Sequence, residues 1–255
     1  MKVVILAGGY GTRLSEETHA LPKPMVQIGD KPILWHIMKY YSTFGFNEFI
    51  ICLGYKGYVI KDYFYSYWYR QSDVTIKTSP KGNEFTIHKS SVEDWEITLV
   101  DTGDDVQTGL RIKRIQPYVN NERFMLTYGD GVGNVDINFL IKQHEALHKV
   151  VTLTAVQPQG RFGVVDFDID KTVTSFNEKG KGKYINAGFM VAEPHLFDCL
   201  GKNEPLEFAP FETLVTKGEL GVYVHNGFWK CMDNLSDLKI LEGFWNSGNV
   251  PWKVW

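Results

Sequence analysis

The segment "LAGGYGTRL", residues 6–14, combines three glycines, a threonine and an arginine directly behind the apolar run "KVVI". Glycine has no Cβ, so a loop of this kind lets backbone N–H groups approach an anion closely. Arg13 adds a forked cation that suits two-point contact with phosphate. The segment therefore predicts a phosphate-binding loop that contains Gly8, Gly9, Gly11 and Thr12.

Two common phosphate-binding motifs do not fit this loop. A dinucleotide-binding loop needs the spacing G-x-G-x-x-G, but Leu14 stands where a third glycine would follow Gly9 and Gly11. A P-loop needs G-x-x-x-x-G-K-[ST], but Gly8 is followed at that distance by Arg13, and no Lys-Ser pair comes next. The spacing excludes both motifs and leaves another kind of phosphate loop.

One lysine and two aspartates could complete a site beside this loop. Lys23 lies between Pro22 and Pro24, which favour a stiff extended segment, although a turn with an exposed lysine is the alternative. Asp130 in "TYGDGV" ends an apolar strand, and Asp233 in "FWKCMDN" either joins it or belongs to the cap of the next helix. Mg²⁺ takes one or two carboxylates together with water and substrate phosphate. Asp130 and Asp233 are therefore the candidate Mg²⁺ ligands.

The order of elements along the chain predicts how these residues come together. Strands are expected at residues 2–7, 48–54, 73–77, 84–88, 97–101, 123–131 and 150–156, and helices at 31–45, 57–69, 110–119 and 135–148. This alternation predicts an α/β fold: a Rossmann-like mixed, mainly parallel sheet flanked by helices. Ligands of such sheets bind at the carboxyl ends of the strands, which is where Asp130 is expected.

The pattern changes after about residue 156. Short strand-like pieces joined by turns follow, then a helical stretch at 210–218 and a last strand at 221–225. The sequence contains neither an internal repeat nor a linker. We therefore expect a single domain over residues 1–255, divided into a core (1–156) and an elaborated carboxy-terminal part (157–255).

Composition excludes several classes of function. The net charge of −3 argues against a general affinity for nucleic acid or anionic membranes. Cys52, Cys199 and Cys231 are odd in number and widely spaced, which is typical of free thiols in a reducing compartment. No apolar stretch approaches the roughly 20 residues that span a bilayer, and no secretion-signal pattern is present. We expect a cytoplasmic protein that binds neither nucleic acid nor membrane.

The segment "HEALH", residues 144–148, fits the zinc-protease pattern H-E-x-x-H on an expected helix. His144 also falls on the packing face of that helix, together with Ile137, Leu140 and Leu147. The sequence offers no convincing third ligand for zinc. We therefore interpret the segment as an ordinary packed helix.

Taken together, "LAGGYGTRL", "PKPM", "GDKPILWHIMK" and "YGDG" resemble the sugar-1-phosphate nucleotidyltransferases, and the resemblance covers essentially the whole chain. The longer runs "LVDTGDDVQTGLRIKR", "GYKGYVIKDYF", "GFWKCMDNLSD" and "PWKVW" resemble most the members that transfer a cytidylyl group to a sugar phosphate. The resemblance implies that CTP and α-D-glucose 1-phosphate give CDP-glucose and diphosphate with Mg²⁺ as cofactor. It also implies a homo-oligomer, for which a hexamer is one form, and a role in the synthesis of bacterial surface polysaccharide.

The resemblance also implies roles for individual residues. Those implied in catalysis are Arg13, Lys23 and Asp130. Those implied in nucleotide binding are Leu6, Ala7, Gly8, Gly9, Gly11, Thr12, Arg13, Lys23, Thr108, Arg111 and Gly129, with Thr108 and Arg111 at the base. Those implied in binding the sugar phosphate are Tyr128, Gly163, Glu178, Lys179, Asn186 and Gly188. In this part the family's usual E-K-P element reads Glu178-Lys179-Gly180, so the loop geometry is less closely defined.

Two alternatives stay open at the level of sequence. The phosphate loop would bind the triphosphate that every NTP shares, so another base or another sugar 1-phosphate would suit the same chemistry. A nucleotide-sensing regulator without turnover is the second alternative. It is disfavoured because Arg13, Lys23, Asp130 and Asp233 are all present.

Overall fold

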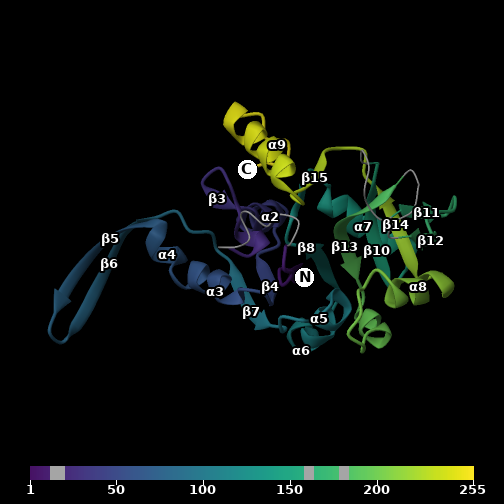
Figure 1. The fold of residues 1–255 in the computed structure, drawn as a ribbon, viewed down its shortest axis with the longest axis horizontal. Helices are drawn as coiled ribbons and strands as arrows, with labels where there is room; N and C mark the ends of the chain where they lie inside the picture. Colours follow the sequence, from purple (N-terminus) through teal and green to yellow (C-terminus); the bar gives the residue numbers. More distant parts are fainter. Residues whose placement is uncertain (12–20, 158–163, 178–183) are drawn as a thin grey trace.

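The computed structural model describes residues 1–11, 21–157, 164–177 and 184–255 (Figure 1). A nine-stranded sheet runs through its centre, with the strand order β12-β11-β13-β8-β1-β4-β7 and with β10 and β14 joined through β13. This arrangement confirms the expected mixed, mainly parallel α/β fold.

The amino-terminal part of the sheet is parallel. β1 pairs with β4 on one side and β8 on the other, and β4 pairs with β7. These strands are β1 (Val3–Leu6), β4 (Glu48–Leu53), β7 (Glu96–Asp101) and β8 (Phe124–Tyr128). Because parallel strands point the same way, their carboxyl ends meet at one edge of the sheet. The glycine loop follows β1 at that edge, and Asp130 follows β8.

The carboxy-terminal part of the sheet is mixed. β13 runs antiparallel to both β8 and β10, whereas β10 and β14 are parallel. β11 and β12 form an antiparallel pair that extends the sheet beyond β13. These strands are β10 (Val151–Val156), β11 (Val164–Phe167), β12 (Val173–Asn177), β13 (Ile185–Ala192) and β14 (Leu220–Val224).

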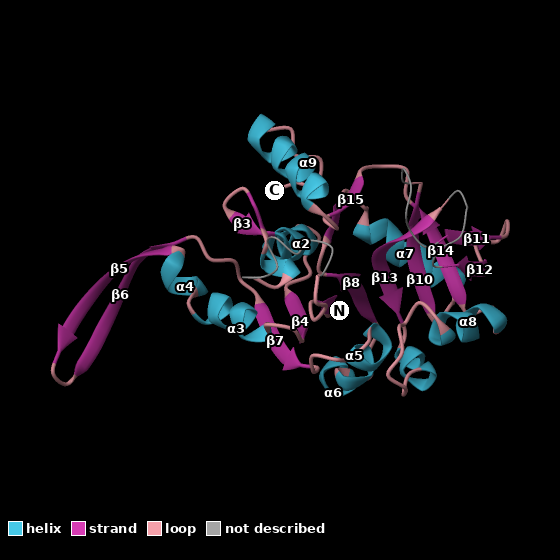
Figure 2. Ribbon diagram, viewed as in Figure 1, coloured by secondary structure: helices cyan, strands magenta, loops and turns pink. Residues whose placement is uncertain are grey.

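Helices cover both faces of this sheet (Figure 2). One face packs against α2 (Ile33–Ser42), α3 (Gly57–Tyr65), α7 (Ile137–Leu147) and α9 (Leu235–Ser247). The other packs against α5 (Thr108–Arg114), α6 (Gln116–Val119), the 3-10 helix η3 (Pro194–Cys199) and α8 (Ala209–Thr216). β1 shows why: Val3 and Ile5 enter the first core, and Val4 and Leu6 enter the second. A strand that is apolar on both faces is stable only when both faces are covered.

Short elements link the sheet edge to the helices. They are η2 (Lys23–Met25), β2 (Gln27–Ile28), β3 (Lys31–Pro32), β9 (Gly131–Gly133) and β15 (Trp229–Cys231). β9 and β15 pair with each other as an antiparallel two-stranded ribbon. This β9–β15 ribbon joins the end of β8 to the start of α9, two points that lie far apart in the sequence.

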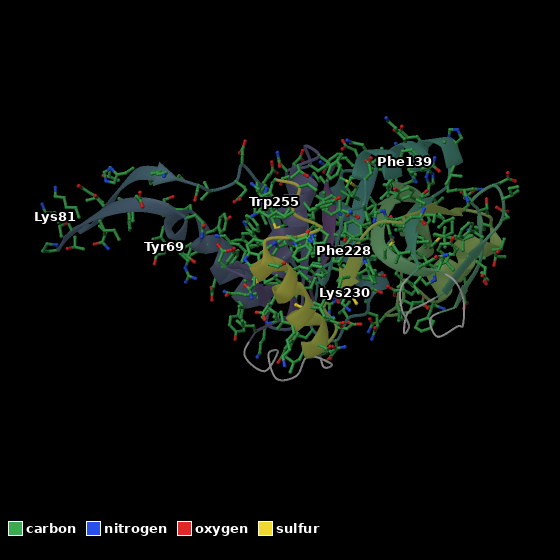
Figure 3. The ribbon with its side chains drawn as sticks, turned by 90° about the horizontal axis from the view of Figure 1, so that it is seen from above. Tyr69, Lys81, Phe139, Phe228, Lys230 and Trp255 are labelled. Atoms are coloured by element: carbon green, nitrogen blue, oxygen red, sulfur yellow. The ribbon has the colours of Figure 1, made fainter. Side chains whose placement is uncertain are left out.

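A β-hairpin extends away from the body of the molecule (Figures 1 and 3). It consists of β5 (Ser72–Ser79) and β6 (Gly82–Ser90), which pair only with each other, and Lys81 lies at its far tip. α4 (Tyr67–Arg70) leads into it. The sequence predicted both strands but not that they would lie outside the main sheet.

The "HEALH" segment is a packed helix end, as interpreted from the sequence. His144 is buried at the end of α7, where its Nδ1 lies 2.8 Å from the hydroxyl of Thr152 and its Nε2 lies 3.1 Å from Glu193. Burial lowers the pKa of His144 below its ordinary value. Both ring nitrogens therefore have protein partners, and across the described part of the chain no cluster of three or more potential metal ligands occurs.

Cys52, Cys199 and Cys231 are all free thiols. Within the described ranges, none of the helices is both long and apolar enough to cross a membrane.

Candidate active site

A cavity of about 480 Å³ opens at the carboxyl edge of the parallel strands. Its lining comes from segments far apart in the sequence: the glycine loop, the 3-10 helix η2, the loop before α5, the end of β8 and the segment before α9. Most of the predicted nucleotide-binding residues line it, namely Leu6, Ala7, Gly8, Gly9, Gly11, Lys23, Thr108, Arg111 and Gly129. The structure thus brings the glycine loop and its predicted partners into one pocket.

An ion-paired lysine lies in this cavity. The ammonium group of Lys23 donates to Asp130 Oδ2 at 2.6 Å and to Asp233 Oδ1 at 2.8 Å, and its side chain is only 12% exposed. Burial alone would lower the pKa of Lys23, but the two neighbouring negative charges raise it above its ordinary value. Lys23 therefore stays charged and holds the two carboxylates within reach of a single cation.

Local sequence fixes the backbone of Lys23. It begins η2 with Pro22 as the preceding cap and Pro24 as the next residue, so the backbone around it is stiff. Pro24 is buried under Gly129, where an added Cβ would lie 3.2 Å from Pro24 Cγ and 2.9 Å from the carbonyl oxygen of Leu6. Pro24 therefore packs the segment that carries Lys23 against the end of β8. The exposed-turn alternative is wrong.

Arg111 connects the glycine loop with the ends of β4 and β7. Its Nη1 donates to the oxygens of Leu53, Thr102 and Gly103, at 2.6–3.1 Å. Its Nη2 donates to the carbonyl oxygens of Gly8 (2.8 Å) and Asp104 (3.0 Å). Every N–H on these two nitrogens therefore has a protein acceptor. Arg111 thus ties the glycine loop to the ends of β4 and β7, and its contact with a base stays a prediction.

The close approach of Arg111 explains two glycines. A Cβ added to Gly8 would lie 2.2 Å from Arg111 Nη1, and one added to Gly54 would lie 2.5 Å from the same atom. Gly9 has no atom within 4 Å of such a Cβ. The first glycine of the loop therefore makes room for a buried guanidinium, while Gly9 leaves the pocket side of the loop open.

Three of the residues predicted at the sugar, Tyr128, Asn186 and Gly188, lie on the neighbouring strands β8 and β13. Gly188 has a φ of +81°, and an added Cβ would lie 2.4 Å from the ring of Tyr128. The side chain of Asn186 accepts a hydrogen bond from the Gly188 N–H at 2.9 Å. Tyr128 lines the cavity. Gly163, Glu178 and Lys179 lie outside the described residues, as do Thr12 and Arg13 of the glycine loop.

The sequence did not identify Glu207 as a residue of the site. Its carboxylate accepts hydrogen bonds from the hydroxyl of Tyr128 and from Thr108 Oγ1, the latter at 2.9 Å. It thus connects a predicted base-side residue with a predicted sugar-side residue. Nothing in the run "NEPLEF" signals this role, because both partners lie at least 79 positions away in the sequence.

Tyr10 and Asp105 were also missed. The Tyr10 hydroxyl donates to the Asp105 carboxylate, and its ring lies 5.0 Å from that of Tyr55. Tyr10 and Asp105 both line the cavity, next to Asp104 and Gln107. This contact bridges the glycine loop and the loop before α5, across the side of the pocket where a base is expected.

The sequence matches the nucleotidyl transferase family over residues 2–229. The chain belongs to that family. Two relatives extend the match over the full length of both chains: it is 52% identical to the glucose-1-phosphate cytidylyltransferase of Salmonella typhi and 42% identical to a probable glucose-1-phosphate cytidylyltransferase of Bacillus subtilis. The predicted family resemblance is thereby confirmed.

Solved structures of other proteins share this nucleotidyl transferase fold. HddC from Yersinia pseudotuberculosis superposes with a TM-score of 0.75 at 23% identity, and 96% of this chain and 99% of that one are covered. A putative glucose-1-phosphate thymidylyltransferase from Bacillus anthracis gives a TM-score of 0.76 at 17% identity, covering 96% and 94%. The fold is thus shared at low sequence identity.

We expect Arg111→Met to lower the free energy of unfolding by about 1–3 kcal/mol, because the carbonyl oxygen of Gly103 loses its donor and the hydrogen bond to Gly8 is lost. Urea unfolding followed by circular dichroism measures the change. Arg114→Met on the same helix is the control: Arg114 is exposed and its Nη1 donates to a single carbonyl, that of Thr102. Equal losses for the two variants would contradict the bridging role of Arg111.

Proposed function

We propose that this protein transfers a cytidylyl group from CTP to α-D-glucose 1-phosphate, giving CDP-glucose and diphosphate. The contact of Lys23 with Asp130 and Asp233 beside the glycine loop carries the proposal, because it places a cation and a paired-carboxylate site where a triphosphate would lie. The full-length identity to enzymes named for glucose 1-phosphate and cytidylyl transfer supports the choice of substrates.

In this reaction an oxygen of the sugar phosphate attacks the α-phosphorus of CTP. A new P–O bond forms as the bond to the bridging oxygen of diphosphate breaks, so attacking and leaving groups are both anionic. The attacking oxygen is already ionised at neutral pH, so no general base is needed. The proposed role of Lys23 is to lower the repulsion between the reacting phosphates. The same role at the departing diphosphate is proposed for Arg13, which rests on the family resemblance alone.

Asp130 and Asp233 fit a divalent cation. Both carboxylates already converge on one positive charge, and Mg²⁺ needs no more than two protein carboxylates when phosphate and water complete its shell. Bound there, Mg²⁺ would supply charge stabilisation to the phosphate oxygens. The proposal assigns these two side chains to holding it, and Gly8, Gly9 and Gly11 to cradling the triphosphate.

The remaining expectations complete the proposal. Residues 1–156 would bind the nucleotide, and residues 157–255 would contribute the sugar-phosphate contacts of Asn186, Gly188, Glu178 and Lys179 within one domain. We propose the cytoplasm as the site of action because both substrates are charged metabolites of that compartment.

The decisive assay measures diphosphate release with each of the four NTPs and several sugar 1-phosphates. We expect turnover with CTP and glucose 1-phosphate, loss of turnover when Mg²⁺ is chelated, and no measurable rate for Asp130→Asn with an unchanged circular dichroism spectrum. Turnover with a different pair only would replace the proposed substrates. No release with any pair would favour a nucleotide-sensing protein.

Lys23→Met gives a separate test of the cation site. The Lys23 ammonium and a divalent cation would contact the same two carboxylates, so they compete. Two unit charges about 4 Å apart in a partly buried site interact by about 4 kcal/mol, so removal of the ammonium should strengthen Mn²⁺ binding to the nucleotide-free protein at least about tenfold.

Electron paramagnetic resonance of free Mn²⁺ measures this binding. Lys39→Met is the matched control, since Lys39 is a half-buried lysine that pairs with Glu93 at 3.2 Å. If Lys23→Met binds Mn²⁺ no better than this control, Asp130 and Asp233 are not the metal ligands.

We also propose that the hairpin joins copies of this chain into a homo-oligomer. The cross-strand pairs Val74–Ile87 and Ile76–Phe85 put four apolar side chains on one face of the hairpin. Ile76, Phe85 and Ile87 are about half exposed, at 47%, 52% and 53%. An isolated two-stranded hairpin is marginal in water, so such a face needs a cover. In a twofold pair of copies the same apolar residues would cover each other.

The double variant Ile76→Glu, Phe85→Glu should lower the mass in solution toward that of one 29.2 kDa chain, as measured by light scattering after size exclusion. The control changes Thr75 and Thr86 to Glu on the opposite face of the same hairpin. A wild-type protein that is already a monomer would refute the proposal, as would equal masses for the two double variants.

A further inference from the structure

We propose that Asp237, in the first turn of α9, is a positioning residue that fixes Asp233 for binding of a divalent cation with the nucleotide. The inference rests on the proposed function, because it concerns the carboxylate pair assigned above to the metal. Asp237 itself does not line the cavity. Its effect would pass entirely through Asp233.

The Asp237 carboxylate binds the backbone on which Asp233 sits. Its Oδ2 accepts hydrogen bonds from the backbone N–H groups of Asp233 and Asn234, at 3.0 and 3.2 Å. In return the Asn234 side chain accepts the N–H of Asp237 at 3.0 Å, which completes a capping box. An ordinary capping box holds one helix end. Here the additional bond reaches the residue before the cap, and that residue is a predicted metal ligand.

The same carboxylate is held from the other side. Asp237 Oδ1 accepts a hydrogen bond from the ammonium group of Lys230, which lies on β15 near the start of α9 (Figure 3). The side chain of Asp237 is 13% exposed, so its charge is well shielded from water and needs this partner. Lys230 therefore fixes Asp237 against the β9–β15 ribbon.

The β9–β15 ribbon connects the backbone near Asp233 to the backbone of Asp130. Cys231 pairs with Gly131, and one step further the N–H of Met232 donates to the carbonyl oxygen of Asp130 at 2.8 Å. Asp130 thus directly precedes one strand of the ribbon, and Asp233 follows the other by two residues. The two carboxylates are therefore attached to adjacent backbone segments at one end of the ribbon. Asp237 restrains the segment that carries Asp233.

This restraint on Asp233 matters because the ligands of a cation site must be held in fixed positions. Without Asp237 two backbone N–H groups lose their acceptor, and Asp233 gains freedom at its φ and ψ angles. The Asp130 side would stay in place through β8 and β9. We therefore expect weaker cation binding with little change in the affinity for CTP itself.

The test titrates Mn²⁺ into protein with saturating CTP and no sugar phosphate, and follows the rise in unfolding temperature. Asp237→Ala should raise the Mn²⁺ concentration at half-saturation about 10- to 100-fold, which is the usual loss when a residue that orients a metal ligand is removed. Asp237→Asn keeps one acceptor oxygen and should give a smaller increase. Because CTP chelates Mn²⁺ equally in every sample, the ratios between variants are directly comparable.

Asp136→Ala is the matched control. Asp136 also stabilises the first turn of a helix through a side-chain bond to backbone: as the N-cap of α7, its Oδ1 accepts the N–H of Phe139 at 2.9 Å. It should lower the unfolding temperature of the ligand-free protein, because a lost cap costs roughly 0.5–2 kcal/mol, and it should leave Mn²⁺ half-saturation within about twofold.

The outcomes separate this inference from the proposed function. If Mn²⁺ and CTP stabilise the wild-type protein and Asp237→Ala matches Asp136→Ala in half-saturation, Asp237 is an ordinary helix cap and this inference alone fails. If Mn²⁺ and CTP do not stabilise the wild-type protein at all, the proposed function fails and this inference fails with it.

Discussion

The arrangement of the pocket depends on the contact of one largely buried ammonium group with two carboxylates. Lys23 is 107 positions from Asp130 and 210 from Asp233, yet all three meet within hydrogen-bond distance. A charge in a largely buried position is stable only with such partners. The end of β8, the prolines around η2 and the start of α9 must therefore be held in fixed relation.

Two independent supports provide that relation on either side of the pocket. On the carboxylate side, the β9–β15 ribbon brings the segments that carry Asp130 and Asp233 together through backbone hydrogen bonds. On the opposite side, the guanidinium of Arg111 ties Gly8 to the ends of β4 and β7. Both supports use atoms whose positions depend on the sheet, so the site forms only when the parallel strands are in register.

The sequence was informative where the signal is local. Alternating apolar runs predicted the strands and helices, and the glycine loop, Lys23, Asp130 and Asp233 all converge as expected. What it could not predict depends on distant partners. Gly8 looks like any loop glycine until Arg111 lies against it. Asp237 looks like an ordinary helix cap until its second oxygen is seen to reach Lys230. The hairpin strands were predicted, but their separation from the sheet depends on packing that local periodicity does not encode.

Under the proposed function the pocket divides into a part that would contact phosphates and walls that would contact the base and the sugar. In the proposed function the glycine loop and Lys23 contact phosphates, which every nucleoside triphosphate shares. The contacts that would distinguish one base or sugar from another are then expected in the walls, where Tyr10 meets Asp105 and where Glu207 joins Thr108 to Tyr128. Of these residues, Tyr10, Asp105 and Glu207 come from loops, which tolerate change better than the sheet edge does. The fold itself is retained at 17–23% identity in solved structures of other proteins.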